Sequence, residues 1–274
     1  MPLPAAHRVP VVVRRDETTR PDEEWVVAEE PLQILTEAPG REPLRLAVTM
    51  RTPGHERELA VGFLLTEGLI RGLVDLAKPT FRELLPGVGR HNEITVRLAR
   101  DFDHGALQRN FLATSSCGVC GKASIDQIER ATPAIARGPA VAARAIAALP
   151  ARLRDAQPLF EQTGGLHAVG LFDAAGELVV AREDVGRHNA MDEAIGRLVL
   201  DDALGAPPAI ALVSGRASFE LVQKAAMAAI PVLCAVSAPS SLAIRAAERF
   251  GMTLVGFLRD RRFTVYAHPE RVAG

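Results

Sequence analysis

Two short, wholly apolar segments, residues 209–213 and 231–236, constrain the fold of this chain more than any other feature. Each is followed by a turn that contains serine and then by a segment with helical periodicity. Apolar strands that lead directly into helices are typical of a sheet that is covered on both faces and is at least partly parallel. The sequence therefore predicts a helix–sheet–helix sandwich for the C-terminal part of the chain.

Four further segments fit this sandwich. Residues 163–172 run from a glycine turn into a strand, and residues 177–182 suit the second strand of a hairpin. Residues 189–200 have the periodicity of a helix, and so do the alanine-rich residues 140–154. The apolar stripe of that second helix consists of Ile146, Leu149 and Leu153. We therefore predict an α/β domain over residues 111–274.

The first 110 residues have a different pattern. Short strands are predicted, in chain order, at residues 11–13, 25–28, 31–35, 44–50 and 93–98, the last of them half-buried. Residues 52–56 open a helix with a proline near its start, and Gly68 is placed to end it. The sequence therefore predicts a smaller α+β domain over residues 1–110.

With 48% hydrophobic residues, the chain has the composition of a soluble globular protein. A formal net charge of −1 argues against bulk attraction to nucleic acid or to an anionic membrane, and no apolar run approaches membrane-spanning length. The N-terminus lacks the pattern of a secretory signal. Three cysteines, an odd number, argue against a disulfide framework. We therefore expect a cytoplasmic protein with neither a nucleic-acid nor a membrane partner.

Two of the cysteines, Cys117 and Cys120, form a C-x-x-C motif between glycines. Residues 124–130 have helical character, so the motif precedes a predicted helix N-terminus. Unpaired backbone N–H groups and the helix dipole stabilise a thiolate there, and Lys122 adds positive charge. The third cysteine, Cys234, lies in an apolar strand and is predicted to be an inert buried thiol. The motif thus indicates a reactive, accessible sulfur.

Polar turns follow the predicted strands. They comprise Ser214, Gly215 and Arg216 after the first apolar strand, and Ser237 and Ser240 after the second. Ligands of α/β sheets bind at the carboxyl ends of strands beside helix N-termini, so these turns suit phosphate, with ordinary N-capping as the alternative. A third segment, residues 183–189, places Asp184 and His188 at a helix entry. For these two residues a functional role competes with two structural alternatives: Asp184 caps the helix, and His188 is a partly buried core histidine.

Four interpretations of the C-x-x-C motif are open. A structural zinc site needs further ligands, and His167, His188 and Cys234 are scattered along the chain. A thioredoxin-like redox pair has this spacing, but the strand and the apolar approach that precede such a pair are missing. A zinc deaminase has an upstream H-x-E, as at residues 91–93, yet here this leads into a strand and Ser116 replaces a proline. A sulfur carrier needs an accessible thiolate that can hold a persulfide, and the motif offers one.

Beyond the motif, the chain closely resembles the FdhD family of formate dehydrogenase accessory sulfurtransferases. The matching blocks are residues 52–54, 58–64, 67–68, 115–121, 163–167, 183–190, 214–220, 237–243 and 256–259. They occur in the family's order and span almost the whole chain after the first forty residues. Agreement over so many independent blocks makes chance similarity a poor explanation.

The resemblance implies a cytidine-deaminase-like α/β domain with a smaller N-terminal domain, in a cytoplasmic homodimer. It implies that sulfur is taken from a cysteine desulfurase and passed to the molybdenum cofactor, in its bis-molybdopterin guanine dinucleotide form, before or during insertion into formate dehydrogenase. On this basis Cys117 holds the persulfide and Cys120 is its companion thiol. No tightly bound metal of the protein's own is expected.

The resemblance also assigns a cofactor-binding segment. It matches Phe257, Leu258, Arg259, Asp260, Arg261 and Arg262, to which we add Ser214, Gly215, Arg216, Ser237, Ser240 and His188 from the turns. Arginines in such a run can engage phosphates, bidentately where the geometry allows, and the plain alternative for this basic run is a solvated strand end. Two alternatives are a cofactor-binding chaperone without sulfur transfer and a zinc-dependent, deaminase-like enzyme.

Overall fold

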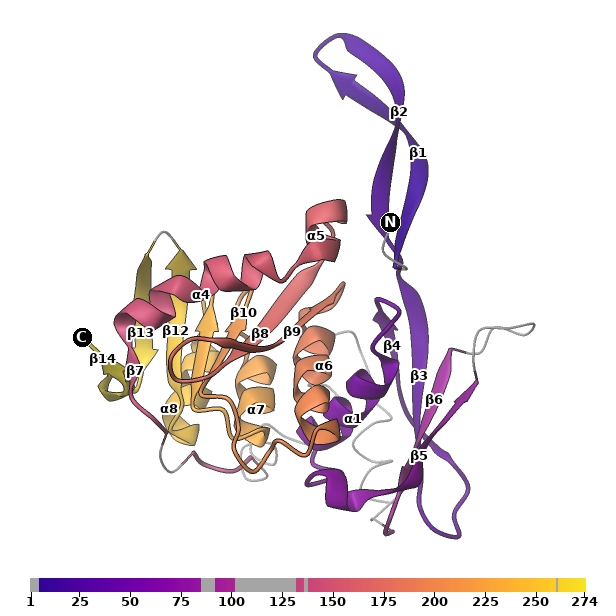
Figure 1. Cartoon of the computed structure of the whole chain (residues 1–274), viewed down its shortest axis with the longest axis vertical. Helices are drawn as coiled ribbons and strands as arrows, with labels where there is room; N and C mark the ends of the chain where they lie inside the picture. The colour runs from indigo at the N-terminus through magenta and orange to yellow at the C-terminus, as the bar shows by residue number, and fades with distance from the viewer. Residues whose placement is uncertain (1–4, 85–91, 102–131, 136–137, 260) are drawn as a thin grey trace.

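The structure is a computed structural model that describes residues 5–84, 92–101, 132–135, 138–259 and 261–274. Three parts are visible in Figure 1: a projecting hairpin, a four-stranded sheet with one helix, and a six-stranded sheet with helices on both faces. In the described part of the chain, no helix is long and apolar enough to cross a membrane.

The hairpin consists of β1 (Ala6–Arg15) and β2 (Thr18–Val27), paired antiparallel along their whole length. Each strand has ten residues, so both are longer than the short strands predicted around residues 11–13 and 25–28. Among the described residues, the packing of the hairpin is confined to its base, where Ala6, Trp25 and Val27 cluster with apolar residues at and next to α5 (Pro158–Thr163). The rest of the ribbon projects away from the body (Figure 1).

The four-stranded sheet has the order β4-β3-β6-β5. Its elements are β3 (Glu30–Glu37), β4 (Leu44–Arg51), α1 (Glu56–Thr66), the short 3-10 helix η1 (Leu73–Asp75), β5 (Leu76–Leu84) and β6 (Glu93–Leu98). The predicted strands at 31–35 and 44–50 and the helix ended by Gly68, which has φ 78°, are confirmed. The prediction of a half-buried strand at 93–98 is wrong in burial, because β6 is an interior strand and Ile94, Thr95 and Val96 are all buried.

The six-stranded sheet has the order β13-β12-β11-β10-β8-β9. Its strands are β8 (His167–Phe172), β9 (Leu178–Asp184), β10 (Ile210–Val213), β11 (Val232–Ala235), β12 (Thr253–Arg259) and β13 (Arg262–Ala267). The strands β10, β11 and β12 are parallel, while β8, β9 and β13 join antiparallel. A further small pair joins β7 (Val141–Ala142) to β14 (Val272–Ala273). The partly parallel sheet is therefore confirmed.

Helices cover both faces of this sheet. On one face lies α4 (Ala143–Asp155), and on the other lie α6 (Arg187–Leu200), α7 (Phe219–Met227) and α8 (Ser241–Phe250). Strand β10 shows the reason for its unbroken apolar sequence: Ile210 and Leu212 belong to the core beneath α4, whereas Ala211 and Val213 belong to the core on the opposite face. The predicted sandwich is confirmed, and a specific relation to cytidine deaminases stays a prediction.

The two sheets are joined by backbone contact between α1 and α6. A Cβ atom built on Gly196 would lie 1.8 Å from the carbonyl oxygen of Glu58, and one on Gly62 would lie 1.8 Å from that of Asp192. Only glycine allows two helices to approach this closely. One hydrophobic core runs through α1, α6, α7, α8 and both sheets. The predicted boundary at residues 110 and 111 lies outside the described residues.

Candidate functional site

The predicted turns lie side by side at the carboxyl edge of the six-stranded sheet. Backbone hydrogen bonds join them in sequence: the N–H of Ser237 donates to Gly215 (3.2 Å), and the N–H of Phe257 donates to Ser237 (3.1 Å). A further N–H, that of Ser240, donates to the carbonyl of Ala217 (3.0 Å). The turns after β10 and β11 are thus brought against the end of β12, as parallel strands dictate.

An irregularity at the end of β12 determines which side chains face outward there. Gly256 pairs with Thr264 and Arg259 with Arg262, so β12 has one more residue than β13 across this interval. Such a bulge reverses the alternation of side chains along a strand. It leaves Leu258 fully buried in the core beneath α4 and exposes Phe257, whose φ of 52° is unusual for a residue with a side chain.

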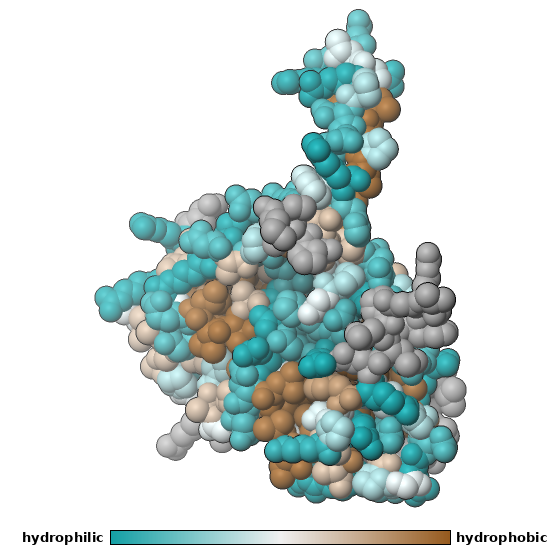
Figure 2. Space-filling model, turned by 45° about the vertical axis from the view of Figure 1, so that its right-hand side comes forward, coloured by the Kyte–Doolittle hydropathy of each residue, from teal (hydrophilic) through white to brown (hydrophobic). Residues whose placement is uncertain are grey.

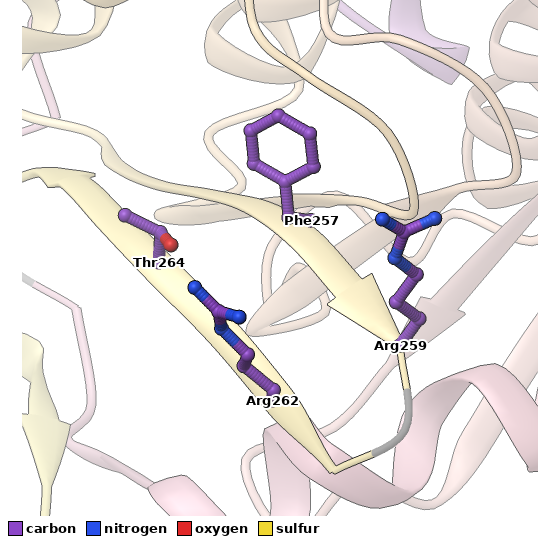
Figure 3. Close-up of a pocket in the computed structure, with 4 residues that line it drawn as sticks. All are labelled: Phe257, Arg259, Arg262 and Thr264. Carbon is purple, nitrogen blue, oxygen red and sulfur yellow. The ribbon is translucent and has the colours of Figure 1, made fainter.

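The outward side chains line a pocket of about 520 Å³. Among the residues that the structure describes, Phe257 and Arg259 from β12 and Arg262 and Thr264 from β13 line it (Figure 3). Figure 3 shows the phenyl ring and both guanidinium groups on the same side of the hairpin. Thr264 was not among the predicted residues, because its strand follows the family segment and nothing in its local pattern marks it. The described part of the pocket therefore offers two cations, one exposed aromatic ring and one hydroxyl.

The other predicted arginines, together with Leu258 and Asp260, are not among the described residues that line this pocket. Leu258 belongs to the core, so its side chain does not line it. Arg261 is exposed in the turn between β12 and β13, with φ 61°. Arg216 is also exposed, in the turn after β10. Asp260 lies outside the described residues.

The predicted serines have structural partners. Ser240 is the N-cap of α8, where its Oγ accepts from the N–H of Ala243 (3.2 Å), so the capping alternative holds for this residue. The Oγ of Ser214 accepts from the N–H of Ala168 (2.9 Å) and ties the end of β10 to β8. Neither contact uses all the hydrogen-bonding capacity of a hydroxyl, which has one donor and two acceptor sites.

The imidazole of His167 and the side chain of Arg187 lie beside Gly215, and the imidazole of His188 is close enough to both for their charges to affect its pKa. A Cβ atom at this glycine would lie 3.5 Å from Nδ1 of His167 and 3.8 Å from Cδ of Arg187. Burial, followed by the charge of Arg187, lowers the pKa of His167. Burial, followed by the charges of Arg187 and Lys224, lowers the pKa of His188 to about 3. Both rings are therefore neutral near pH 7 and can accept or donate a hydrogen bond.

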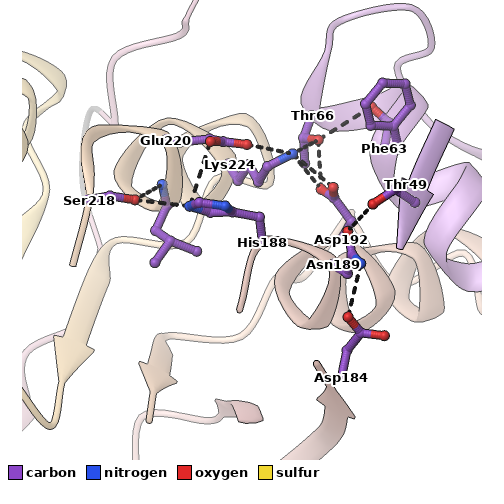
Figure 4. Close-up of polar contacts among 11 residues, drawn as sticks. Thr49, Phe63, Thr66, Asp184, His188, Asn189, Asp192, Ser218, Glu220 and Lys224 are labelled. Carbon is purple, nitrogen blue, oxygen red and sulfur yellow. Dashed lines mark hydrogen bonds and ion pairs between the residues drawn. The ribbon is translucent and has the colours of Figure 1, made fainter. Parts of the chain in front are cut away.

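His188 is held by α7. Its Nε2 lies 3.2 Å from Oγ of Ser218, the N-cap of that helix, and 3.5 Å from a carboxylate oxygen of Glu220 (Figure 4). The contacts continue to Lys224, whose Nζ donates to both oxygens of Asp192 at 2.9 and 2.8 Å. Burial alone lowers the pKa of Lys224, but the charges of Asp192 and Glu220 outweigh it, so its pKa is raised.

The acidic part of segment 183–189 is structural. The carboxylate of Glu183 accepts from the N–H groups of Leu159 and Phe160 at the start of α5. Asp184 is fully buried and accepts from the N–H groups of Thr52 (2.6 Å) and Gly186 (2.7 Å). Burial raises its pKa to about 6 against these hydrogen bonds. Asp184 therefore fastens the loop before α1 to the start of α6.

The predicted cysteine residues differ in whether the structure describes them. Cys117, Cys120 and the predicted helix at 124–130 lie outside the described residues, as does His91 of the H-x-E. Cys234 is fully buried in β11, and burial raises the pKa of its thiol, in agreement with the prediction of an inert thiol. Within the ranges that the structure describes, no group of three His, Cys, Asp or Glu side chains could hold a metal ion.

This geometry defines an α/β protein whose candidate ligand site lies at the carboxyl edge of a mixed, six-stranded sheet. Residues 27–273 match the family model described as the FdhD/NarQ family. The chain therefore belongs to the FdhD/NarQ family.

Named relatives agree with this assignment. The chain is 49% identical over 268 residues to a "Sulfur carrier protein FdhD" of Streptomyces coelicolor, covering 93% of this chain and 91% of the relative. A protein of the same name from Sulfurisphaera tokodaii is 40% identical over 265 residues, covering 97% and 98%. A crystal structure from Desulfotalea psychrophila, described as a formate dehydrogenase accessory protein, has a TM-score of 0.74 at 26% identity, covering 98% of this chain and all of that one.

Proposed function

We propose that this protein is a cytoplasmic sulfurtransferase that serves formate dehydrogenase. Its relatives are named sulfur carriers, a similar structure is described as a formate dehydrogenase accessory protein, and the C-x-x-C motif offers a thiolate. The observation that carries the proposal furthest is the pocket of Phe257, Arg259, Arg262 and Thr264, because it gives a sulfur carrier a place to hold its recipient.

The first chemical step needs only the chain's own sulfur and a donor persulfide. The thiolate of Cys117 attacks the terminal sulfur of a cysteine desulfurase persulfide, the S–S bond of the donor breaks, and the donor leaves as a thiolate. Cys117 then carries the sulfur as a persulfide, with no net oxidation or reduction. Cys120, three residues away, is the companion thiol. A persulfide is more acidic than a thiol, so it needs no strong base for onward transfer.

The pocket suits the proposed recipient, the bis-molybdopterin guanine dinucleotide form of the molybdenum cofactor, which is the substrate here. Each guanine dinucleotide carries phosphates and a purine ring. The guanidinium groups of Arg259 and Arg262 suit phosphate oxygens, and the exposed ring of Phe257 can stack on a flat base. The hydroxyl of Thr264 adds one donor and acceptor.

The sulfur step is tested by incubating the protein with a cysteine desulfurase and cysteine labelled at sulfur. Wild-type protein and a Cys234→Ala control should acquire label that a reductant releases, whereas Cys117→Ser should acquire none. Equal labelling of Cys117→Ser would show that another atom carries the sulfur. If the wild type stays unlabelled although its pocket binds nucleotide, the chaperone alternative gains support, and zinc that is lost on replacing either motif cysteine would support the deaminase-like alternative.

The pocket is tested by titration with guanosine diphosphate as the probe. Replacing Arg259 or Arg262 by alanine removes a charge-assisted hydrogen bond, for which a loss of about tenfold or more in affinity is expected. The exposed Arg245 on α8 supplies the matched control, and Arg245→Ala should bind as the wild type does. If all three variants bind alike, the pocket is not the nucleotide site.

A further inference from the structure

A group of basic side chains lies at the carboxyl edge of the six-stranded sheet, apart from the pocket at Phe257. His167 is the first residue of β8, and Arg187 and His188 open α6. All three lie near the turn at Gly215, which follows β10. Strand β10 is two strands away from β12, so about 10 Å separate the two strands. We call His167, Arg187 and His188 the basic cluster.

Arg187 has a donor that no described residue uses. Its Nε is shielded from solvent and has no hydrogen-bond partner among the described residues. Arg182 in the neighbouring strand β9, by contrast, forms an ion pair with Glu58. A shielded donor without an acceptor destabilises a folded protein, and native structures rarely keep one unless water, an ion or a ligand supplies the acceptor. The unpaired Nε therefore indicates a ligand that accepts hydrogen bonds.

Two helix N-termini meet at the basic cluster. Helix α6 begins at Arg187, and α7 begins one residue after its N-cap Ser218. Because Nε2 of His188 lies 3.2 Å from Oγ of Ser218, the first turns of the two helices are in contact. The backbone N–H groups of a first helical turn carry partial positive charge and favour anions. Both helix dipoles thus add to the positive charge of Arg187.

The charges near the two imidazoles also favour an anion. Burial, followed by the positive charge of Arg187, lowers the pKa of both His167 and His188. One carboxylate, that of Glu220, lies 3.5 Å from Nε2 of His188. The same side chain lies 3.8 Å from Nζ of Lys224 (Figure 4), which offsets its charge. The positive charge of Arg187 therefore dominates at the imidazoles.

The donors of the basic cluster suit a tetrahedral oxyanion. The guanidinium of Arg187 can donate two parallel hydrogen bonds, and each imidazole can donate one. Gly215 has no side chain, which leaves room beside Nδ1 of His167. Figure 2 shows the exposed apolar side chains of the β1–β2 hairpin along its projecting part, whereas the basic cluster lies in the body of the protein. The cluster thus suits a charged ligand better than an apolar one.

We propose that Arg187, His167 and the turn at Gly215 form an oxyanion site, separate from the pocket at Phe257, whose ligand is a phosphate group. His188 lines this site from the first turn of α6. The phosphate group belongs either to a free inorganic ion or to the nucleotide in the pocket, and the same donors serve both. The proposal does not depend on sulfur transfer.

Calorimetric titration of the full chain with inorganic phosphate at pH 7 tests the site. A chain carrying both Arg259→Ala and Arg262→Ala serves as the background, because it lacks the cations of the pocket. In this background Arg187→Met should weaken phosphate binding by about tenfold or more, since a charge-assisted contact is lost. Arg144→Met is the matched control: Arg144 also lies in the first turn of a helix, α4, but is exposed, and its loss should change the affinity less than about twofold.

Two further variants separate a ligand site from a structural role. Gly215→Ala adds a methyl group whose nearest listed neighbour is 3.5 Å away, so the variant should melt as the wild type does. The methyl group takes up the room beside Nδ1 of His167 and should weaken phosphate binding by about threefold or more. Arg187→Met should not lower the melting temperature in the absence of anions, because the Nε that it removes has no partner among the described residues.

Guanosine diphosphate, titrated into chains with the intact pocket, distinguishes the two sources of phosphate. If Arg187→Met weakens its binding as strongly as that of inorganic phosphate, the nucleotide supplies the group. If the affinity for guanosine diphosphate changes less than about twofold, the ligand is a free ion. The proposal is overturned if the background chain binds no inorganic phosphate at millimolar concentration, or if Arg187→Met and Arg144→Met bind it alike. A failure of the pocket itself would instead appear as unchanged binding of guanosine diphosphate by the single Arg259 and Arg262 variants.

Discussion

Replacing Lys224 by methionine should destabilise the protein in a manner that depends on pH. The side chain of Lys224 is 3% exposed, and its ammonium group donates to both oxygens of Asp192 and to Oγ1 of Thr66. Its removal leaves the carboxylate of Asp192 buried with the Thr66 hydroxyl as its remaining donor. Breaking a buried ion pair by removing one partner costs about 3–5 kcal/mol.

The pKa of Asp192 sets an upper limit on that cost. Burial already raises the pKa of Asp192 above its ordinary value of 3.8, although Lys224 acts against this. Without Lys224 the carboxyl of Asp192 can avoid the cost of a buried charge by binding a proton. Protonation costs about 1.36 kcal/mol for each pH unit above the ordinary pKa of 3.8. The limit is therefore about 4.4 kcal/mol at pH 7 and about 1.6 kcal/mol at pH 5. A carboxyl with a raised pKa contributes stability at low pH that is lost as the pH rises, so the deficit must shrink on acidification.

Urea denaturation followed by circular dichroism at pH 7 and pH 5 measures this deficit. Lys78→Met is the matched control, because Lys78 is exposed and the same chemical change there should cost less than about 0.5 kcal/mol. A double variant, Lys224→Met with Asp192→Leu, should recover much of the lost stability, since an apolar pair can replace a buried ion pair. A deficit below about 1 kcal/mol at pH 7, or one that is equal at both pH values, would refute this reasoning.

Two other predictions follow from the same structure. Gly196→Ala should lower the free energy of unfolding by about 2–3 kcal/mol, because its Cβ would lie 1.8 Å from the carbonyl oxygen of Glu58. Denaturation of Gly205→Ala is the control, since nothing lies within 4 Å of a Cβ there, and similar losses would contradict the argument. His188, whose pKa is lowered from 6.5 to about 3, should make the wild type lose stability as the pH falls from about 6.5, at up to about 1.4 kcal/mol per pH unit. His188→Gln should show a shallower loss over that range in melting experiments, and an unchanged slope would show that His188 is not the group involved.

Much of the C-terminal architecture could be predicted because local pattern and burial agree there. The stripe of Ile146, Leu149 and Leu153 has helical spacing, and all three side chains are buried in α4. The unbroken apolar sequence of β10 and β11 reflects cores on both faces of one sheet. In such segments a few neighbouring residues are enough to predict the secondary structure.

Other features depend on partners that lie far away in the sequence. Strand β5 contains Lys78 and Pro79 and shows no alternation, and it exists because it pairs with β6. The bulge that exposes Phe257 depends on the register between β12 and β13. Lys224 gave one local hint, a lysine among apolar residues of a helix, but its partner is 32 residues away. Thr264 lines the pocket because β13 pairs with β12, and the residues next to Thr264 in the sequence do not reveal this pairing.

The predicted site residues agree best with the structure where the segments that match the family lie at the ends of strands. Phe257, Arg259 and Arg262 do line one pocket, and the turns with Ser214 and Ser237 lie at the same sheet edge. The acidic residues of segment 183–189 were less well interpreted. Glu183 and Asp184 accept backbone hydrogen bonds from α5 and from the loop before α1, which a sequence cannot reveal because these three donors come from remote segments.

The backbone contact between α1 and α6 also has a consequence during synthesis. The first sheet is fastened to residues far downstream: the N–H of Thr52 donates to a carboxylate 132 residues later, and α1 packs on a helix at a similar separation. At a translation rate of about 5–20 residues per second, roughly 7 to 26 seconds pass before that partner emerges from the ribosome. During this interval the apolar face of α1 has no α6 to cover it. We therefore expect the nascent chain to depend on chaperones, and the first sheet to complete its folding only after α6 has been made.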